Sequence, residues 1–240
     1  MRVVISQSML FPWVGMLEQV RLADIFVHYD DVQFSKGGFA NRVQIKSATG
    51  PQWMTIPTRN LQLGQRICEV EIAPPEKWVD RHLMLLSRSF EGAPFANDAI
   101  AIAVETYSVQ YRYLGEIARA SLLALCRYFN LVEDRRFVDA QDLGVAGSGS
   151  QRVLDIVERL GGDEYITGHG AVRYLDHQMF ERSGVAVRYV QYRRMAYPQL
   201  HGAFTPYVSA LDLIANCGPQ GRAHVCSDSI PWREFLHEPA

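Results

Sequence analysis

The spacing of apolar residues predicts strand–helix–strand units at both ends of the chain. Near the N-terminus, residues 3–6 form a β-branched run that ends in polar residues, as a buried parallel strand does. The segment 13–20 then places apolar residues at i, i+3, i+4 and i+7, which gives a helix one apolar face. Residues 25–29 form a second apolar run that ends at two acidic residues. This order predicts two parallel strands joined by a helix.

The same alternation returns after residue 147. It predicts helices over 151–160, 171–181 and 207–216 and strands over 164–167 and 185–190. Ser148 and Gln151 have capping-box spacing at the start of the first of these helices. Between the two ends, a turn-rich stretch predicts a β-hairpin over 43–56, and residues 76–130 have helical periodicity. The prediction is one α/β domain over residues 1–240, with a mostly parallel, Rossmann-like sheet, helices on both faces, a β-hairpin and a helical insertion at about 76–130.

Composition narrows the classes of function without selecting one. Apolar residues make up 48% of the chain and charged residues 21%, which are ordinary values for a globular protein. The formal charge of −2 gives no overall field that favours nucleic acid or an anionic membrane. The chain has no apolar run of membrane-spanning length and no signal-peptide pattern, so we expect a cytoplasmic protein without a membrane partner.

The cysteines and glycines give no sign of a particular cofactor. Cys68, Cys126, Cys217 and Cys226 form no C-x-x-C pair, so we expect reduced thiols and predict no metal site. Cys217 has no histidine close in sequence and is a weak candidate nucleophile. The turn after the first strand matches neither the dinucleotide-binding glycine pattern nor a P-loop.

Polar residues follow three of the predicted strands and form the candidate site. Ligands of open parallel sheets bind beyond the carboxyl ends of the strands, where the strand order reverses. That rule places Gln7, the pair Asp30 and Asp31, and Gly168 with His169 on one rim. Alternate residues of a strand face opposite sides, so only one carboxylate of the pair can point inward.

We assign candidate catalytic roles to Asp31, Asp30 and His169. An inward carboxylate can bind an ammonium group or act as a general base, and a histidine between glycines can act as a base near neutral pH. Each residue also has a structural interpretation. The aspartates would then be turn and salt-bridge residues, and the histidine would have no chemical role.

Further segments supply candidate contacts to a substrate. The turn at Gln7 offers free backbone N–H groups to an anion, and the loop around Arg42 offers a bidentate contact to phosphate; a solvated loop is the alternative there. The long aromatic and polar connection around Gln199 is typical of a lid. Asp212 is a carboxylate among apolar neighbours, where burial would raise its pKa unless it is paired. The predicted substrate-binding residues are Gln7, Trp13, Lys36, Asn41, Arg42, Gly168, Gln199 and Asp212.

Taken in order, these segments resemble the WbqC-like family. The resemblance runs from about residue 3 to residue 219, and the ordered set is more specific than any one motif. The matching stretches are Gln7 with Pro12–Gly15, Asp30–Phe34 with Asn41–Arg42 and Ile45–Lys46, Trp53–Pro57, Tyr165–Gly168 with Gly170–Ala171, Tyr174–Asp176, Tyr197–Gln199, and Leu211–Asp212 with Asn216–Gly218.

The resemblance implies a role in bacterial surface-sugar, including O-antigen, or secondary-metabolite biosynthesis. It further implies transfer of a glycyl or other acyl group to an amino sugar. The family usually begins with His-Gln-Pro, where this chain has Ser6, Gln7 and Ser8. If the family histidine is catalytic, this chain has lost the role or moved it, for example to His169.

Three functions follow as hypotheses. The leading one is a transferase that moves an activated acyl or aminoacyl group onto the amine or hydroxyl of a small-molecule acceptor. Its donor is left open between an adenylate, a thioester and an aminoacyl-tRNA, although the sequence gives no strong nucleic-acid signal. A nucleotide-dependent ligase or nucleotidyltransferase would use the first turn for triphosphate and Asp30 with Asp31 for magnesium. The third hypothesis is a non-catalytic sugar-nucleotide-binding module.

Overall fold

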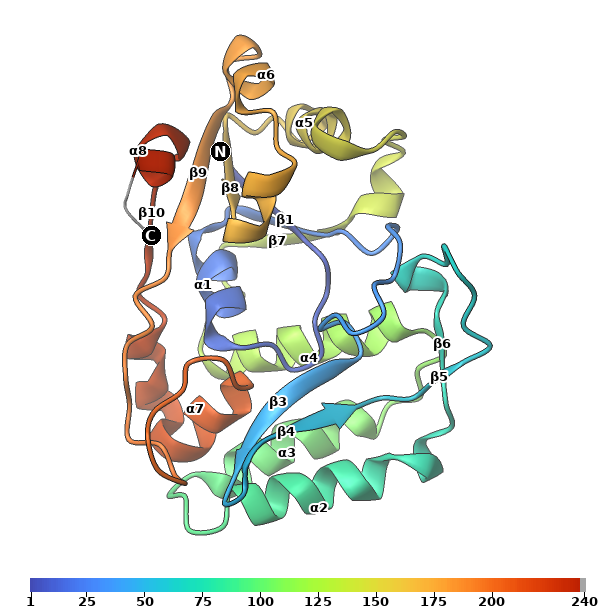
Figure 1. Ribbon diagram of the computed structural model, residues 1–240, viewed down its shortest axis with the longest axis vertical. Helices are drawn as coiled ribbons and strands as arrows, with labels where there is room; N and C mark the ends of the chain where they lie inside the picture. Colours follow the sequence, from blue (N-terminus) through green and yellow to red (C-terminus); the bar gives the residue numbers. More distant parts are fainter. Residues whose placement is uncertain (238–240) are drawn as a thin grey trace.

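The computed structural model describes residues 1–237, and a six-stranded sheet forms one end of the molecule (Figure 1). The strands lie in the order β10-β9-β8-β1-β2-β7. Their bounds are β1 Arg2–Ser6, β2 Ile25–His28, β7 Arg136–Asp139, β8 Glu164–Thr167, β9 Ala186–Gln191 and β10 Asp228–Pro231. Neighbouring strands pair in parallel, except that β10 runs antiparallel to β9. The predicted, mostly parallel sheet is confirmed.

The strand order reverses beside β1. The chain begins in the middle of the sheet, passes through β2 to β7 at one edge, and then returns to β8 on the other side of β1. This arrangement is the Rossmann order 3-2-1-4-5-6, with β10 as an antiparallel sixth strand. The carboxyl ends of β1 and β8 therefore border the position at which doubly wound sheets bind their ligands.

Helices cover both faces of the sheet, as the sequence predicts. Val4 and Phe26 point to the face covered by α1 and α4, whereas Val3 and Ile5 point to the face covered by α5 and α6. Neighbouring residues of one strand thus enter two different apolar cores, as the two-residue period of a strand requires. The helices are α1 Val14–Leu22, α2 Val79–Ser89, α3 Ala96–Tyr107, α4 Leu114–Tyr128, α5 Gly149–Arg159, α6 His177–Arg182, α7 Ala210–Cys217 and α8 Trp232–His237.

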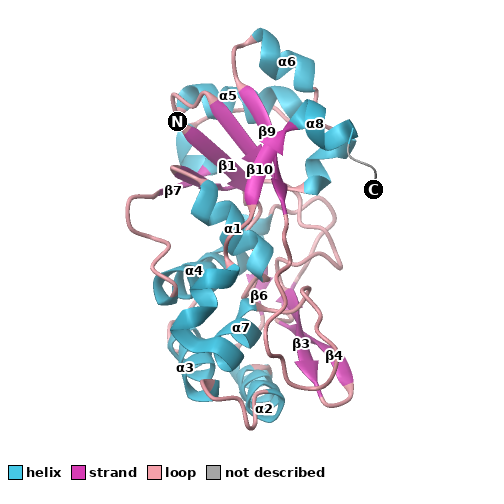
Figure 2. Cartoon of the chain, turned by 90° about the vertical axis from the view of Figure 1, so that its left-hand side faces the viewer, coloured by secondary structure: helices cyan, strands magenta, loops and turns pink. Residues whose placement is uncertain are grey.

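The long segment between β2 and β7 contains the predicted hairpin and helical insertion. The hairpin pairs β3 (Arg42–Ser47) with β4 (Gly50–Thr55), and a smaller antiparallel pair joins β5 (Thr58–Arg59) to β6 (Glu71–Ile72). Helices α2, α3 and α4 follow, which confirms the helical region predicted for about 76–130. Figure 2 shows the hairpin, α2 and α3 at the end of the molecule opposite the sheet, with α1 and α4 between. One apolar cluster runs from the sheet face through α4 to these helices.

Parts of the structure differ from the sequence prediction. The helix expected over 171–181 is split into a short 3-10 helix, His169–Arg173, and α6. The split occurs because Asp176 caps α6, accepting a hydrogen bond from the backbone N–H of Met179 at 3.1 Å. Strands β7 and β10 lie where the sequence pattern predicts no strand. β10 tolerates Pro231 because an edge strand can spare one N–H group.

Candidate functional site

A cleft of about 860 Å³ opens where the strand order reverses. Its wall includes Ser6 and Gln7 after β1, Asp31 after β2, Ser148 at the start of α5, and Gly168 and His169 after β8. The sequence predicts that Gln7, Asp30, Asp31 and Gly168 share one rim; Gln7, Asp31 and Gly168 line the cleft, whereas Asp30 does not. Strand-end geometry brings these residues together although they are far apart in the sequence.

Asp31 is the buried acid of this cleft. Its Oδ2 accepts a hydrogen bond from Nη2 of Arg152, and the two side chains are only 9% and 8% exposed. Arg152 also donates from Nε to the backbone oxygen of Val145 at 3.0 Å and stacks over the ring of Tyr29 at 5.0 Å. Burial tends to lower the pKa of Arg152, but the hydrogen bonds to and charges of Asp31 and Tyr29 together more than offset it, and the pKa is raised.

The second carboxylate oxygen of Asp31, Oδ1, is buried and has no hydrogen-bond partner within residues 1–237. Most buried polar atoms in proteins are hydrogen-bonded, and an unpaired one costs about 1–3 kcal/mol. Asp31 lines the cleft, so a small movement of its side chain would bring this oxygen to a donor group of a bound ligand. The oxygen suits an ammonium or a hydroxyl group.

The first turn of α5 faces the same cleft with unpaired backbone groups. Gly147 and Gly149 have φ angles of +98° and +61°, a left-handed conformation that favours glycine. Ser148 is the N-cap residue, but its side chain makes no capping hydrogen bond, so the expected capping box is wrong. The free N–H groups and the helix dipole therefore favour an anion here. The sequence signal, Gly147-Ser148-Gly149, was a glycine-rich turn before a helix.

His169 lies at the rim, and one of its ring nitrogens already forms a hydrogen bond within the protein. Its Nε2 lies 2.7 Å from the backbone oxygen of Val190, and a carbonyl oxygen only accepts, so Nε2 carries the proton. In the neutral ring, Nδ1 then holds a lone pair and is able to accept a proton. The ring packs against Tyr192 and Phe235, with centroid distances of 4.9 and 4.7 Å. His169 thus has both a structural contact and a basic nitrogen.

Gly168 is required by the close packing at the end of β8. A Cβ atom at this position would lie 3.0 Å from the hydroxyl of Tyr192 and 3.4 Å from Nε2 of Gln19. Gln19 donates from Nε2 to the same hydroxyl at 2.9 Å. Gly168 therefore lets Tyr192 approach the rim, and its contribution to the site is space rather than a side chain.

An aromatic wall closes one side of the cleft. The ring of Trp13 lies 5.0 Å from that of Tyr192 and 5.9 Å from that of Tyr207, and the guanidinium of Arg194 lies 5.4 Å from the Tyr207 ring. All four side chains line the cleft. Flat rings beside a cation suit a sugar or a planar group that carries negative charge. The sequence prediction included Trp13 but missed Tyr192, Arg194 and Tyr207, which come from loops far along the chain.

Asp30 lies outside the cleft, in a buried network. It is 1% exposed, and both of its oxygens accept hydrogen bonds. Ser8 donates to it from its backbone N–H at 2.9 Å and its hydroxyl at 2.8 Å, and Nε of Arg119 donates at 2.8 Å. Arg119 also pairs with Asp139 at the end of β7. Asp30 therefore joins two strand ends to α4 and lies outside the cleft, which does not support the catalytic role we assigned.

The cationic loop also lies away from the cleft. Lys36, Asn41 and Arg42 do not line it. Arg42 binds the backbone oxygen of Gly37 and stacks over the ring of Trp53 at 4.1 Å, while Asn41 donates to the backbone oxygen of Ile56 at 3.0 Å. Lys36 is exposed. The expected contact between this loop and the ligand of the cleft is not supported.

Gln199 and Asp212 belong to a buried hydrogen-bond network that we call the loop lock, formed by Lys46, Tyr197, Gln199, Asp212 and Asn216. Oδ1 of Asp212 accepts from Nε2 of Gln199 at 2.7 Å and from the hydroxyl of Tyr197 at 2.8 Å. Burial raises the pKa of Asp212, although these two hydrogen bonds oppose the rise. The lock fixes the connection after β9 onto α7. Its residues do not line the cleft, so the predicted substrate contacts of Gln199 and Asp212 are not supported.

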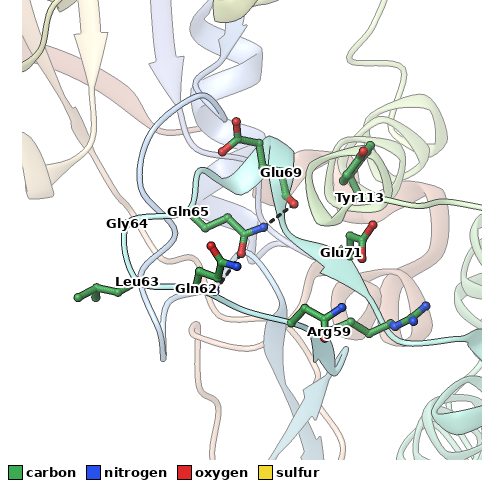
Figure 3. Close-up of a pocket in the computed structure, with 9 residues that line it drawn as sticks. Arg59, Gln62, Leu63, Gly64, Gln65, Glu69, Glu71 and Tyr113 are labelled. Atoms are coloured by element: carbon green, nitrogen blue, oxygen red, sulfur yellow. Dashed lines mark hydrogen bonds between the residues drawn. The ribbon is translucent and has the colours of Figure 1, made fainter.

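A second cavity, of about 520 Å³, lies beside the connection between β5 and β6 (Figure 3). Glu69 and Glu71 at its wall are already paired with Arg66 and Arg112. Gln65 bridges the wall by donating to the backbone oxygen of Glu69 at 2.7 Å. Arg59 also lines this cavity, and none of the predicted site residues does.

Metal-ligating and thiol groups do not gather at the cleft. Within the described chain, no group of three or more His, Cys, Asp or Glu side chains could hold a metal ion. The four cysteines are free thiols, and burial raises the pKa of Cys217, which makes its thiolate less accessible. No helix among residues 1–237 has both the length and the apolar character needed to cross a membrane.

Comparison with known proteins identifies relatives over nearly the whole chain. A family model described as the WbqC-like protein family matches residues 7–224. An uncharacterized protein of Mycobacterium tuberculosis is 31% identical over 222 residues, covering 91% of this chain and 95% of that protein. No solved structure matches the chain.

Proposed function

The chain belongs to the WbqC-like protein family, and from its cleft we propose that it is a group transferase that moves an acyl or aminoacyl group onto an amine. The observation that carries the proposal is the unpaired, buried oxygen Oδ1 of Asp31. A protein that folds around an unsatisfied carboxylate oxygen bears a cost in stability, and a substrate donor group removes that cost. An amine is the donor that such a carboxylate binds most strongly.

Asp31 positions the acceptor in this proposal. Arg152 holds the carboxylate through Oδ2, and Oδ1 has no partner among the described residues, so this oxygen is the one that binds the acceptor. The amine nitrogen attacks the carbonyl carbon of the activated acyl group, and the bond from that carbon to its leaving group breaks. The nitrogen loses a proton to Oδ1 of Asp31 or to Nδ1 of His169. The leaving group departs with the electron pair.

The remaining walls suit the rest of such substrates. Free N–H groups at the start of α5 face the negative charge of a phosphorylated group or of the departing group. The rings of Trp13 and Tyr207 offer flat surfaces for a sugar, as expected of an amino-sugar acceptor. Ser6, at the position of the usual family histidine, and His169 line the same cleft, which supports the transfer of the base role to His169.

The test measures product mass and turnover. Purified protein is incubated with a panel of amino-sugar nucleotides and activated glycyl donors (adenylate, thioester, aminoacyl-tRNA), and acylated products are detected by mass spectrometry. Asp31→Asn is expected to lower turnover about 10²-fold or more, because it removes the proton acceptor and the charge that binds the amine. Asp212→Asn, the same change in the loop lock, is the matched control. Equal turnover in wild type and Asp31→Asn would reject the proposal.

A binding module without catalysis is the second candidate. The observation in its favour is the ion pair between Asp31 and Arg152, which already engages one oxygen of the carboxylate in a structural contact. Such a protein would bind a sugar nucleotide in the cleft and release it unchanged. Binding of an amino-sugar nucleotide by calorimetry, without product from any donor, would favour this candidate.

A further inference from the structure

A separate cavity of about 600 Å³ lies between the hairpin β3–β4 and α2. Figure 1 shows the hairpin lying alongside α2, far from the sheet rim. This cavity shares no lining residue with the cleft described above. Its volume is within the range of small-molecule sites, which is about 300–1,000 Å³.

The charged side chains that line this cavity are all positive. Arg81 and Arg88 line it from α2, and the wall contains no aspartate or glutamate. Neither arginine forms an ion pair or hydrogen bond within residues 1–237, whereas most ion pairs of this chain use arginine. The two positions are seven residues apart on α2, so they lie on the same helix face, about 10 Å apart along its axis. Two unpaired guanidinium groups in an acid-free wall favour a ligand with more than one negative charge.

An unpaired hydroxyl lies deeper in the same wall. Ser89 is 1% exposed, and its Oγ has no hydrogen-bond partner in the described chain. A buried serine on a helix ordinarily donates to the carbonyl one turn earlier or bonds to another group. Ser89 lies at the C-terminal end of α2, next to Arg88, and lines the cavity. Its free hydroxyl is a second and independent sign of a missing ligand.

The other walls are neutral and largely preformed. Gln52 donates from Nε2 to the hydroxyls of Ser47 and Thr49, at 3.0 and 2.9 Å. His82 bonds to the hydroxyl of Tyr107 and to the backbone oxygen of Thr55, both at 3.0 Å. Burial lowers the pKa of His82 to about 4, so this ring is neutral at pH 7. The positive charge of the cavity therefore comes from the two arginines alone.

We propose that this cavity binds a small phosphorylated molecule that carries a planar ring. Arg81 and Arg88 contact the phosphate oxygens, because the guanidinium fork matches phosphate geometry, and Ser89 donates to one of them. The half-exposed indole of Trp53 forms a flat wall for the ring. The site is independent of the proposed transfer reaction and lies on the insertion rather than on the sheet.

Isothermal titration calorimetry of the full chain with ADP and with pyrophosphate tests the site. ADP is expected to bind more tightly than pyrophosphate. The variants Arg81→Gln and Arg88→Gln should each weaken ADP binding at least tenfold. Arg182→Gln removes the same charge from an exposed position on α6 and should leave the affinity unchanged. Ser89→Ala should weaken binding about fivefold without lowering the melting temperature, since it removes an unpaired buried hydroxyl.

Other outcomes would overturn the site. Failure of both probes to bind wild-type protein would do so. An equal loss in Arg182→Gln would indicate attraction by net charge alone. A loss in Arg194→Gln with none in Arg81→Gln or Arg88→Gln would place the phosphate in the cleft. Unchanged affinity in Ser89→Ala would place it outside the cavity.

Discussion

The cleft and the loop lock contain the same kinds of residue, but they complete their hydrogen bonds to different degrees. In the lock, Nζ of Lys46 donates to Oε1 of Gln199 at 2.9 Å and to the backbone oxygens of Gly202 and Ala203 at 3.2 and 2.7 Å. All three donors of the ammonium group are used. In the cleft, Arg152 binds one oxygen of Asp31 and the other oxygen stays unpaired.

This difference separates a structural acid from a candidate functional one. Asp212 is buried in α7, and the side chain of Asp31 is only 9% exposed. A completed network needs nothing from outside, so it stabilises the fold without taking part in binding. An incomplete one at the end of a parallel strand has a position for a ligand group. We therefore choose the candidate functional acid by its unpaired oxygen rather than by residue type.

The largest expected effect on stability is that of Asp30→Asn. This variant tests whether an aspartate takes part in the reaction because it lies near the cleft or only when its hydrogen bonds are incomplete. Asp30 is next to Asp31 in sequence, but its network is complete. Asp30→Asn replaces an acceptor oxygen with an NH₂ group that faces the donors of Ser8 or Arg119. We expect the free energy of unfolding to fall by about 3–4 kcal/mol, the usual cost of breaking a buried ion pair. Chemical denaturation measures this loss.

Turnover of the folded fraction of Asp30→Asn is the decisive control. It should stay within about threefold of wild type when measured well below the melting temperature, because Asp30 does not line the cleft. If turnover instead falls as far as in Asp31→Asn while the protein is folded, closeness to the cleft matters more than hydrogen-bond completeness.

A somewhat smaller loss of stability is expected for a substitution in the loop lock. Lys46→Met keeps the apolar stem of a side chain that is 4% exposed but removes all three donors. Three acceptors then lose their partner, and Asp212 loses a nearby positive charge. We expect a loss of about 2–3 kcal/mol in the free energy of unfolding, with ligand affinity of the cleft unchanged. Lower affinity for an amino-sugar nucleotide in this variant would mean that the loop after β9 acts as a lid.

The sequence was sufficient for the fold class and for the position of the cleft. Apolar periodicity predicted β1, β2, β8 and β9 with their helices, and the strand-end rule then brought Gln7, Asp31 and Gly168 together, although it also placed Asp30 on that rim. β7 escaped prediction because its four residues, Arg136–Asp139, mix charged and apolar side chains. Short strands of this kind are fixed by their neighbours rather than by their own pattern.

The hydrogen-bond and packing partners of each side chain could not be predicted from the sequence. Nothing near Asp30 in the chain shows that Arg119, 89 positions away, completes its network. Likewise, Arg152 reaches Asp31 across 121 positions, and Tyr207 reaches Trp13 only through tertiary packing. Which of two adjacent aspartates is free is therefore a property of the folded chain. Gln199 is a further example. Its sequence context predicts a lid, but in the folded chain its side chain accepts a hydrogen bond from Lys46.

The smallest expected effect is that of Asp212→Asn in the loop lock, where one carboxylate oxygen accepts every hydrogen bond; it is the same chemical change as Asp31→Asn. Asparagine keeps an oxygen that can accept from Tyr197, Gln199 and Asn216, so the free energy of unfolding should fall by less than about 1 kcal/mol.

Because burial raises the folded-state pKa of Asp212 above its ordinary value of 3.8, the folded protein binds a proton more readily than the unfolded chain does. That contribution is present at low pH and is lost as pH rises from 3.8 through the raised pKa. Asp212→Asn should therefore flatten this part of the stability profile, measured by denaturation at several pH values, and leave turnover within about twofold. A loss of turnover as large as that of Asp31→Asn would show that a complete hydrogen-bond network does not keep a buried carboxylate out of the chemistry.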